Sequence, residues 1–216
     1  DGCDEIVDYD ITASAERRPI DIGIVQDVAK VVRIPFAVGG GISSLDDMQN
    51  VLLAGAEKVS VNSLAVTNPQ IIAEGAKAFG SQCIVLGMDP VANPDKEKFP
   101  SGYEITTRGF RVRTGMDAVE WAKRAADMGA GEIVVNSVDA DGTRAGFDLN
   151  VTRLIADAVG VPVIASGGAG NPQHLEEAYH KGHADAAIVA GMIHTGDYTI
   201  SEIKSAMQGV PLRQTA

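Results

Sequence analysis

Four aspartates end or follow short apolar runs that have the composition of buried strands. Asp10 ends "EIVDYD", Asp89 ends "IVLGMD", and Asp139 and Asp141 follow "EIVVNSV". A carboxylate at the end of such a strand loses hydration, which raises its pKa and suits it to general acid or base catalysis. Asp141, in "DADGT", also fits an ordinary turn, whereas Asp89 precedes a proline rather than a helix. We therefore predict that Asp89 is the catalytic residue.

Two glycine-rich turns have the residue types of phosphate-binding loops. "FAVGGGIS" carries Gly40 and Gly41, and "IASGGAGNP" carries Gly167 and Gly168. Glycine lets the backbone approach a ligand closely, and the N-terminus of a following helix favours an anion. Each turn alone could be a simple tight connection, but the two turns occupy equivalent points of an internal repeat. Together they predict two phosphate sites, and hence a substrate that is phosphorylated at both ends.

Two further pairs follow strands beside these turns and could complete the phosphate sites, although ordinary turn chemistry would also explain them. They are Asn62-Ser63 and Ala190-Gly191. The four histidines have no metal-ligand spacing, and polar helix positions usually face solvent, so no role is assigned to His174, His180, His183 and His194. The dinucleotide fingerprint G-x-G-x-x-G is absent. We expect neither a metal nor a cofactor.

Alternating strands and helices must position these residues. Short runs rich in Val and Ile alternate with helical patterns, which is typical of βα units around a parallel sheet. The predicted strands are Glu5–Asp10, Pro35–Val38, Lys58–Asn62, Cys83–Asp89, Glu132–Val138, Pro162–Ser166 and Asp185–Ala190. The predicted helices are Asp21–Val32, Ser44–Ala54, Pro69–Ala78, Met116–Met128, Leu149–Val159, Pro172–His180 and Ile200–Met207. A polar insert after the fourth strand contains "YEITT" and "FRVRT" on either side of Arg108-Gly109, which predicts a β-hairpin over one mouth of the sheet.

An internal repeat defines the architecture. A shift of 127 residues places Pro35 on Pro162, Gly40-Gly41 on Gly167-Gly168 and Gly55 on Gly182 without a gap. Two related halves of about four βα units each predict a TIM-type (βα)8 barrel. The second half has a βα unit for which the first half shows no counterpart. We therefore expect one domain over residues 1–216, an N-terminally truncated barrel of about seven βα units, with half-repeats 1–80 and 81–216.

Composition narrows the possible classes of protein. The net charge of −11 disfavours broad binding to nucleic acid, which needs clustered Lys and Arg. No apolar run is long enough to span a membrane, no signal peptide is evident, and two cysteines are too few for a disulfide framework. These features predict a cytoplasmic protein without a membrane or nucleic-acid partner.

Six motifs in this order resemble the cyclase subunit of imidazole glycerol phosphate synthase, over essentially the whole chain. They are "YDITAS", "FAVGGGI", "KVSVNS", "NSVDADGTRAGFD", "IASGGAG" and "AIVAGMIH". The resemblance implies a (βα)8 barrel of histidine biosynthesis. It also implies a reaction in which ammonia and a phosphoribulosyl-formimino aminoimidazole carboxamide ribonucleotide, a bisphosphate, give imidazole glycerol phosphate by cyclisation and lyase cleavage.

The resemblance also implies roles for individual residues. Of the family's two catalytic aspartates, the one on the fifth strand matches Asp89 and the one on the first strand has no counterpart, which puts the activity of this chain in doubt. One phosphate would be held by Gly41, Asn62 and Ser63, and the other by Gly142, Gly168, Ala190 and Gly191. Asp10 would lie near the substrate, and Asp141 would support its loop. At the opposite face, three residues match a charged gate that admits ammonia from a glutaminase partner, namely Glu5, Lys58 and Glu132.

Two alternatives stay open. The related phosphoribosyl isomerase of the same pathway also takes a bisphosphate and has a half-barrel repeat, but "DITAS" and "VDADGTRAGFD" look more like the cyclase. The chain could instead be a non-catalytic barrel fragment that associates with itself. Seven strands leave two unpaired edges where closure needs eight, and open edges recruit partners. We therefore expect a homo-oligomer formed through the open barrel edges.

Overall fold

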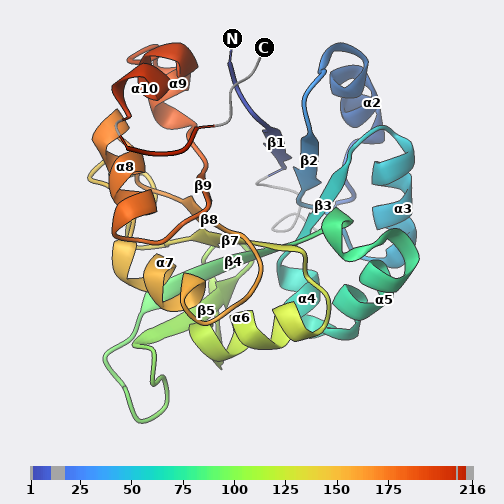
Figure 1. Cartoon of the computed structure of the whole chain (residues 1–216). Helices are drawn as coiled ribbons and strands as arrows, with labels where there is room; N and C mark the ends of the chain where they lie inside the picture. Colours follow the sequence, from blue (N-terminus) through green and yellow to red (C-terminus); the bar gives the residue numbers. More distant parts are fainter. Residues whose placement is uncertain (1, 11–17, 208, 213–216) are drawn as a thin grey trace.

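A computed structural model describes residues 2–10, 18–207 and 209–212 of the chain. Its main sheet has seven parallel strands that pair in the order of the chain. The strands are β1 (Ile6–Tyr9), β2 (Phe36–Gly39), β3 (Lys58–Val61), β4 (Ile84–Ala92), β7 (Glu132–Asn136), β8 (Val163–Ser166) and β9 (Ala186–Ala187). The sheet curls with helices on its outside (Figure 1). This is the TIM-barrel type of α/β fold that the repeat predicts.

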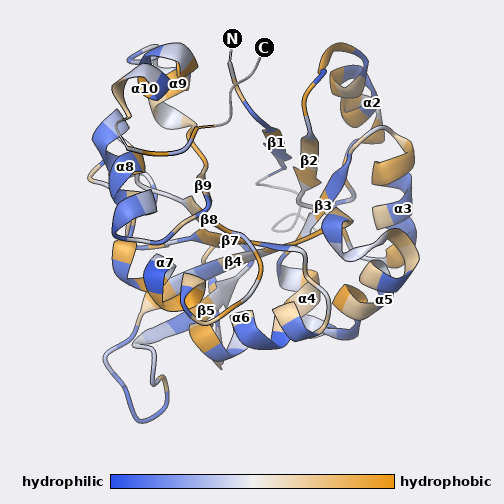
Figure 2. Ribbon diagram, in the orientation of Figure 1, coloured by the Kyte–Doolittle hydropathy of each residue, from blue (hydrophilic) through white to orange (hydrophobic). Residues whose placement is uncertain are grey.

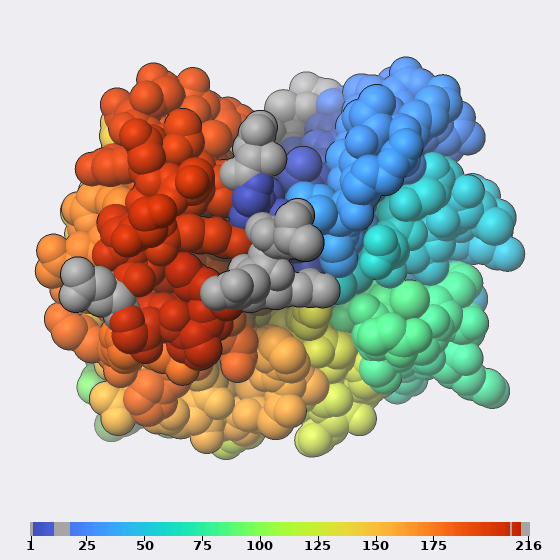
Figure 3. All heavy atoms as spheres, turned by 45° about the horizontal axis from the view of Figure 1, so that its top comes forward, coloured from blue at the N-terminus to red at the C-terminus, as the bar shows by residue number. Residues whose placement is uncertain are grey.

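The helices follow the strands and cover the outer face of the sheet. They are α2 (Ile22–Val31), α3 (Leu45–Leu53), α4 (Ser63–Thr67), α5 (Gln70–Phe79), α6 (Ala118–Asp127), α7 (Leu149–Ala156), α8 (Pro172–His180), α9 (Gly191–His194) and α10 (Ile200–Ala206), with a 3-10 turn η1 (Ser81–Cys83). Hydrophobic and hydrophilic residues alternate along most of them, as expected of helices with one buried face (Figure 2). The first half of the chain and the second half occupy opposite sides of the molecule (Figure 3).

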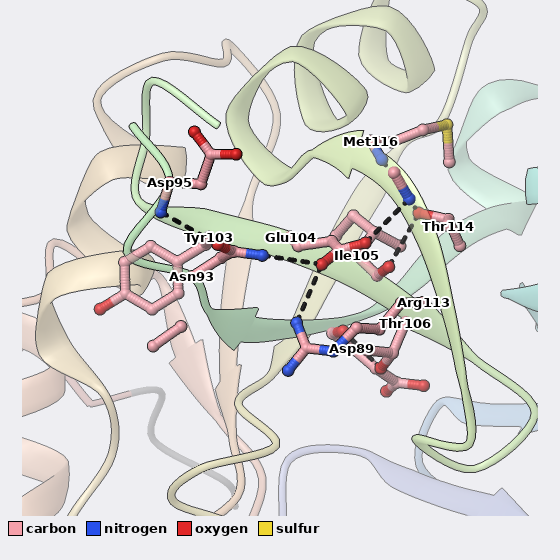
Figure 4. Close-up of polar contacts among 12 residues, drawn as sticks. Asp89, Asn93, Asp95, Tyr103, Glu104, Ile105, Thr106, Arg113, Thr114 and Met116 are labelled. Atoms are coloured by element: carbon pink, nitrogen blue, oxygen red, sulfur yellow. Dashed lines mark hydrogen bonds and ion pairs between the residues drawn. The ribbon is translucent and has the colours of Figure 1, made fainter. Parts of the chain in front are cut away.

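The insert after the fourth strand forms the predicted hairpin, β5 (Tyr103–Thr107) and β6 (Val112–Asp117). β4 runs past its predicted end at Asp89 because residues 89–92 pair antiparallel with β5. The buried carboxylate of Glu104 accepts hydrogen bonds from the Asn93 side chain, Arg113 and the Gly115 backbone, at 2.9 Å each. These contacts, drawn in Figure 4, fasten the hairpin beside the carboxyl end of the parallel sheet.

The predicted boundaries of most elements are right to within two or three residues, and three differences are informative. β9 is only two residues long because, among the described residues, it pairs on one side only, with β8. The two short helices α4 and α9 were not predicted, since each is a single turn with no measurable apolar period. β1 likewise pairs only with β2 in the described part of the chain. The division into one domain with two half-repeats stays a prediction.

No helix in the described ranges is long and apolar enough to cross a membrane.

Candidate functional site

Asp89 lies at the point where the parallel sheet gives way to the hairpin. The parallel pairing of β4 with β7 ends at Met88, and Asp89 begins the antiparallel pairing with Thr106. The side chain of Asp89 is buried, with 8% of the residue exposed, and its Oδ2 accepts a hydrogen bond of 2.7 Å from Asn62 Nδ2. Thr106 Oγ1 donates to its backbone carbonyl at 2.9 Å (Figure 4). The hairpin and the neighbouring strand therefore fix this carboxylate.

Burial raises the pKa of Asp89 to about 6, although hydrogen bonds from Asn62 and Asn136 oppose the rise and the charge of Asp141 adds to it. A carboxyl group with this pKa exchanges its proton near neutral pH, as a general acid or base requires. The oxygen of the same amide, Asn62 Oδ1, is buried and accepts no hydrogen bond from a described residue. It is an acceptor that a ligand beside Asp89 could use.

The first predicted phosphate site joins the ends of β1, β2 and β3. Gly40 and Gly41 follow β2 with φ of +89° and +68°. A side chain on Gly40 would place its Cβ 2.3 Å from the carbonyl oxygen of Asp10, so only glycine allows this close approach. Asn62 and Ser63 begin α4 with no side-chain cap for its first turn. Ser63 Oγ accepts a hydrogen bond of 3.1 Å from the backbone N–H of Arg108 at the hairpin tip.

The second predicted site is built in the same way at the end of β8. Gly167 and Gly168 have φ of +83° and +104°, and a Cβ on Gly168 would lie 2.1 Å from the carbonyl oxygen of Gly146. The backbone of Gly146 in turn donates to the carbonyl of Gly168 at 2.8 Å. The loop after β7, which carries Asp141 and Gly142, therefore packs on the glycine turn.

Ala190 and Gly191 begin α9 just as Asn62 and Ser63 begin α4. Ala190 has φ −132° and ψ −68°, close to the −131° and −87° of Asn62, and again no side chain caps the first turn. A Cβ on Gly142 or Gly191 would meet no atom within 4 Å, so both glycines border open space. No described hydrogen bond links Ala190 or Gly191 to Gly168, and their membership of one site stays a prediction.

Asp10 lies at the end of β1, as predicted, but it is already engaged. Its two carboxylate oxygens accept hydrogen bonds of 2.6 and 2.8 Å from Arg18. A substrate contact through this carboxylate would share it with Arg18.

The three predicted gate residues meet at the opposite end of the strands. Lys58 Nζ donates to Glu5 Oε2 and to Glu132 Oε1, each at 2.7 Å. Burial alone would lower the pKa of Lys58, but the hydrogen bonds and charges of the two carboxylates raise it, so it stays charged. Lys58 and Ser60 are two residues apart on β3 and thus share a face. Asn62 directly follows β3 and, like Ser60, lies beside Gly87 of β4, so the ion-paired cluster and the Asn62–Asp89 pair lie along the same side of the sheet.

Sequence reasoning missed two inner residues between these clusters. Tyr9 packs its ring against Gly39, where an added Cβ would lie 2.7 Å from the ring, and its hydroxyl donates to Ser60 Oγ at 3.4 Å. Burial raises the pKa of Tyr9 to about 12, with smaller contributions from the charges of Asp89, Glu5 and Glu132. The alternation of inward residues along β1 and β3 could have identified both residues.

Within the described ranges, no three His, Cys, Asp or Glu side chains are arranged to hold a metal ion.

Comparisons with known proteins agree with this architecture. The family described as "Histidine biosynthesis protein" matches residues 1–199. Three similar curated proteins are each "Imidazole glycerol phosphate synthase subunit HisF". That of Desulforapulum autotrophicum is 57% identical and aligns over 99% of this chain and 83% of its own length. Those of Desulfatibacillum aliphaticivorans and Syntrophobacter fumaroxidans are 58% and 57% identical, over 98% and 100% of this chain and 82% and 84% of their own lengths.

These coverages do not support the predicted absence of a first βα unit. The match over nearly the whole chain does decide the family. The chain therefore belongs to the histidine biosynthesis protein family, as an enzyme of the group of HisF cyclase subunits of imidazole glycerol phosphate synthase.

Proposed function

We propose that this chain catalyses the ammonia-dependent cyclisation and cleavage of a phosphoribulosyl-formimino aminoimidazole carboxamide ribonucleotide, with Asp89 as the group that transfers protons. The observation that carries the proposal is the buried Asp89 carboxyl, hydrogen-bonded to Asn62 and with its pKa raised to about 6, at the strand ends that also carry two matched glycine turns. Positioned proton transfer contributes about 10²–10⁴-fold in rate.

The phosphates of the substrate would bind at the two turns, one at Gly41 with Asn62 and Ser63, and the other at Gly168 with the loop of Gly142. A long substrate fixed at both ends presents its central atoms to Asp89, which lowers the entropic cost of ring closure. Asn62 Oδ1, buried and unpaired among the described residues, can accept a hydrogen bond from the substrate there.

Ammonia would enter from the opposite end of the strands. The Glu5–Lys58–Glu132 cluster lies there, and we propose that it borders the entry from a glutaminase partner. This ion-paired cluster can open by side-chain rotation without breaking backbone hydrogen bonds of the sheet, because both contacts are between side chains.

Two finer proposals concern the protein as a whole. β1 and β9 each have one strand partner in the described part of the chain, so we propose that copies associate through these edges. Light scattering that showed a stable monomer at micromolar concentration would refute this. The cytoplasmic location predicted from the sequence stays a prediction.

The test of function supplies the bisphosphate with ammonium salt and follows imidazole glycerol phosphate. We expect product from the native chain and a rate at least about 100-fold lower from Asp89→Asn. Asp139→Asn is the matched control, because Asp139 is an exposed carboxylate that accepts a hydrogen bond from the Ala92 backbone at 2.8 Å. Equal rates for the native chain and Asp89→Asn would refute the role of Asp89. No product and no binding of the bisphosphate would refute the function.

A further inference from the structure

A carboxylate on helix α3 fastens the first glycine turn. Asp47 Oδ2 accepts hydrogen bonds from the backbone N–H and the hydroxyl of Ser43, at 2.8 and 2.7 Å. In return, Ser44 Oγ accepts a hydrogen bond of 3.1 Å from the backbone N–H of Asp47. The helix and the last residues of the turn are therefore tied together by a reciprocal exchange.

An imidazole fastens the second glycine turn in the same way. His174 Nδ1 accepts a hydrogen bond of 3.1 Å from the backbone N–H of Gly170. In return, Asn171 Oδ1 accepts a hydrogen bond of 3.3 Å from the backbone N–H of His174. His174 was predicted to have no role because it lies at a polar helix position, yet it is partly buried and faces the turn rather than solvent.

The two arrangements are equivalent in the repeat although their residue types differ. The shift of 127 residues that aligns the glycines places Asp47 on His174, Ser43 on Gly170 and Ser44 on Asn171. The two N-cap residues have nearly the same backbone, with φ −152° and ψ 169° at Ser44 and φ −158° and ψ 167° at Asn171. The two halves differ in residue type at all three positions, yet the same backbone hydrogen bonds form in both. This indicates that the shape of the glycine turn depends on these hydrogen bonds and not on particular residue types.

This pattern determines which amides of each turn are available to a ligand. The N–H groups of Ser43 and Gly170 are used by the helix. Among the described residues, none accepts a hydrogen bond from the N–H groups of Gly41 or Gly168. Asp47 and His174 therefore hold each turn by its last amide, and the glycine amides keep no acceptor among the described residues.

We infer that Asp47 and His174 are positioning residues for the two phosphates of the substrate, each holding its glycine turn in the shape that presents the Gly41 or Gly168 amide to the anion. This inference rests on the proposed function, since it assigns a cause to the geometry of the same two phosphate sites.

The sign of the Asp47 effect separates positioning from simple electrostatics. Burial alone would raise the pKa of Asp47, but hydrogen bonds from Ser43 and Ser44 lower it, so the side chain is an anion at neutral pH. A negative charge beside a phosphate repels it, and its removal should strengthen binding if charge alone matters. If Asp47 positions the turn, Asp47→Ala weakens binding, whereas Asp47→Asn, which keeps an acceptor oxygen and loses the charge, binds at least as well as the native protein.

The experiment titrates the full chain with inorganic phosphate and follows the backbone amide signals of Gly41 and Gly168 by NMR, so that each site reports its own occupancy. We expect Asp47→Ala to weaken phosphate binding at Gly41 by roughly 5- to 20-fold, and His174→Ala to weaken it at Gly168 by roughly 3- to 10-fold, each leaving the other site unchanged. The smaller effect at Gly168 follows from the extra support by Gly146. Asp47→Asn and His174→Asn should restore binding, because asparagine places an acceptor near the lost one.

The outcomes separate the two ideas. Native binding with unchanged affinity in both alanine variants would refute the inference alone. Stronger binding in Asp47→Ala would also refute it, in favour of charge. No phosphate-induced shift at either glycine of the native protein would refute the proposed function, and the inference with it. The asparagine variants and thermal melts show whether an alanine variant lost binding through global unfolding.

Discussion

The buried Asp89 carboxylate should lower the free energy of unfolding of this protein at neutral pH. Its folded pKa of about 6 exceeds the ordinary value of 3.8 because burial disfavours the charged form. The difference corresponds to about 3 kcal/mol. The folded protein binds this proton more tightly than the unfolded chain, so the contribution of Asp89 to stability is largest below pH 3.8. That contribution is lost as the pH rises through about 6 and is constant above.

Asparagine at position 89 carries no charge at any pH and can still accept the hydrogen bond from Asn62. We therefore expect Asp89→Asn to increase the free energy of unfolding by up to about 3 kcal/mol at pH 7.5. The gain should shrink as the pH falls below 6 and vanish near pH 4. Urea denaturation of both proteins at a series of pH values measures this directly, because the carboxyl groups that do not interact with Asp89 contribute equally to both curves and cancel.

Asp139→Asn is the control for this experiment. Asp139→Asn removes a carboxylate from the same end of the sheet, but from an exposed position, and should give no such gain. Asp89→Asn that is less stable than the native protein at pH 7.5 would refute the reasoning. A stability difference that does not depend on pH would also refute it. A variant that gains stability and loses turnover would show that burial of Asp89 is maintained for chemistry, since active sites commonly sacrifice stability.

Three further predictions concern the supports of the site. Gly40→Ala should lower the free energy of unfolding, measured in urea, by about 2–4 kcal/mol, because the new Cβ would lie 2.3 Å from the Asp10 carbonyl oxygen. Gly142 also has a positive φ but borders open space, so Gly142→Ala should lower it by only about 1 kcal/mol. Lys58→Met should lower the free energy of unfolding by about 1–3 kcal/mol, because it leaves two carboxylates without their cation. Adding Glu132→Gln should recover part of this loss, and strictly additive effects of the two substitutions would contradict a coupled cluster. Glu104→Gln should lower the free energy of unfolding by about 1.5–3 kcal/mol and speed limited proteolysis of the β5–β6 hairpin. An unchanged cleavage rate would show that this carboxylate does not hold the hairpin in place.

The positions of the strands and of the glycine turns could be predicted because they depend on local features. Runs of Val and Ile define β3, β7 and β8, and the 127-residue repeat identifies both turns without knowledge of the fold. The meeting of Glu5, Lys58 and Glu132 was implied by family resemblance, and the structure shows that the three side chains do meet.

The contacts that tune the site could not be predicted in the same way. The hydrogen bond between Asn62 and Asp89 depends on the register of β3 against β4, where Val61 faces Leu86, and no local pattern encodes that register. The burial of Glu104 depends on the hairpin folding back onto β4. His174 illustrates the same limit, because a polar residue in the first turn of a helix looks solvent-exposed until the loop before it is placed.

The residues between the Lys58 cluster and Asp89 affect which form of ammonia can pass through the interior. Lys58 with its two carboxylates lies at one end of the inner face and Asp89 lies at the other, while Tyr9 and Ser60 lie between them. The pKa of about 12 keeps Tyr9 protonated at any physiological pH, so both hydroxyls there are neutral. An ion crossing this region would lose hydration without meeting an opposite charge, whereas a small neutral molecule can exchange hydrogen bonds with two hydroxyls. In the proposed function the molecule that crosses is ammonia. Among the described residues, the two neutral hydroxyls between the clusters therefore favour passage of NH₃ over NH₄⁺.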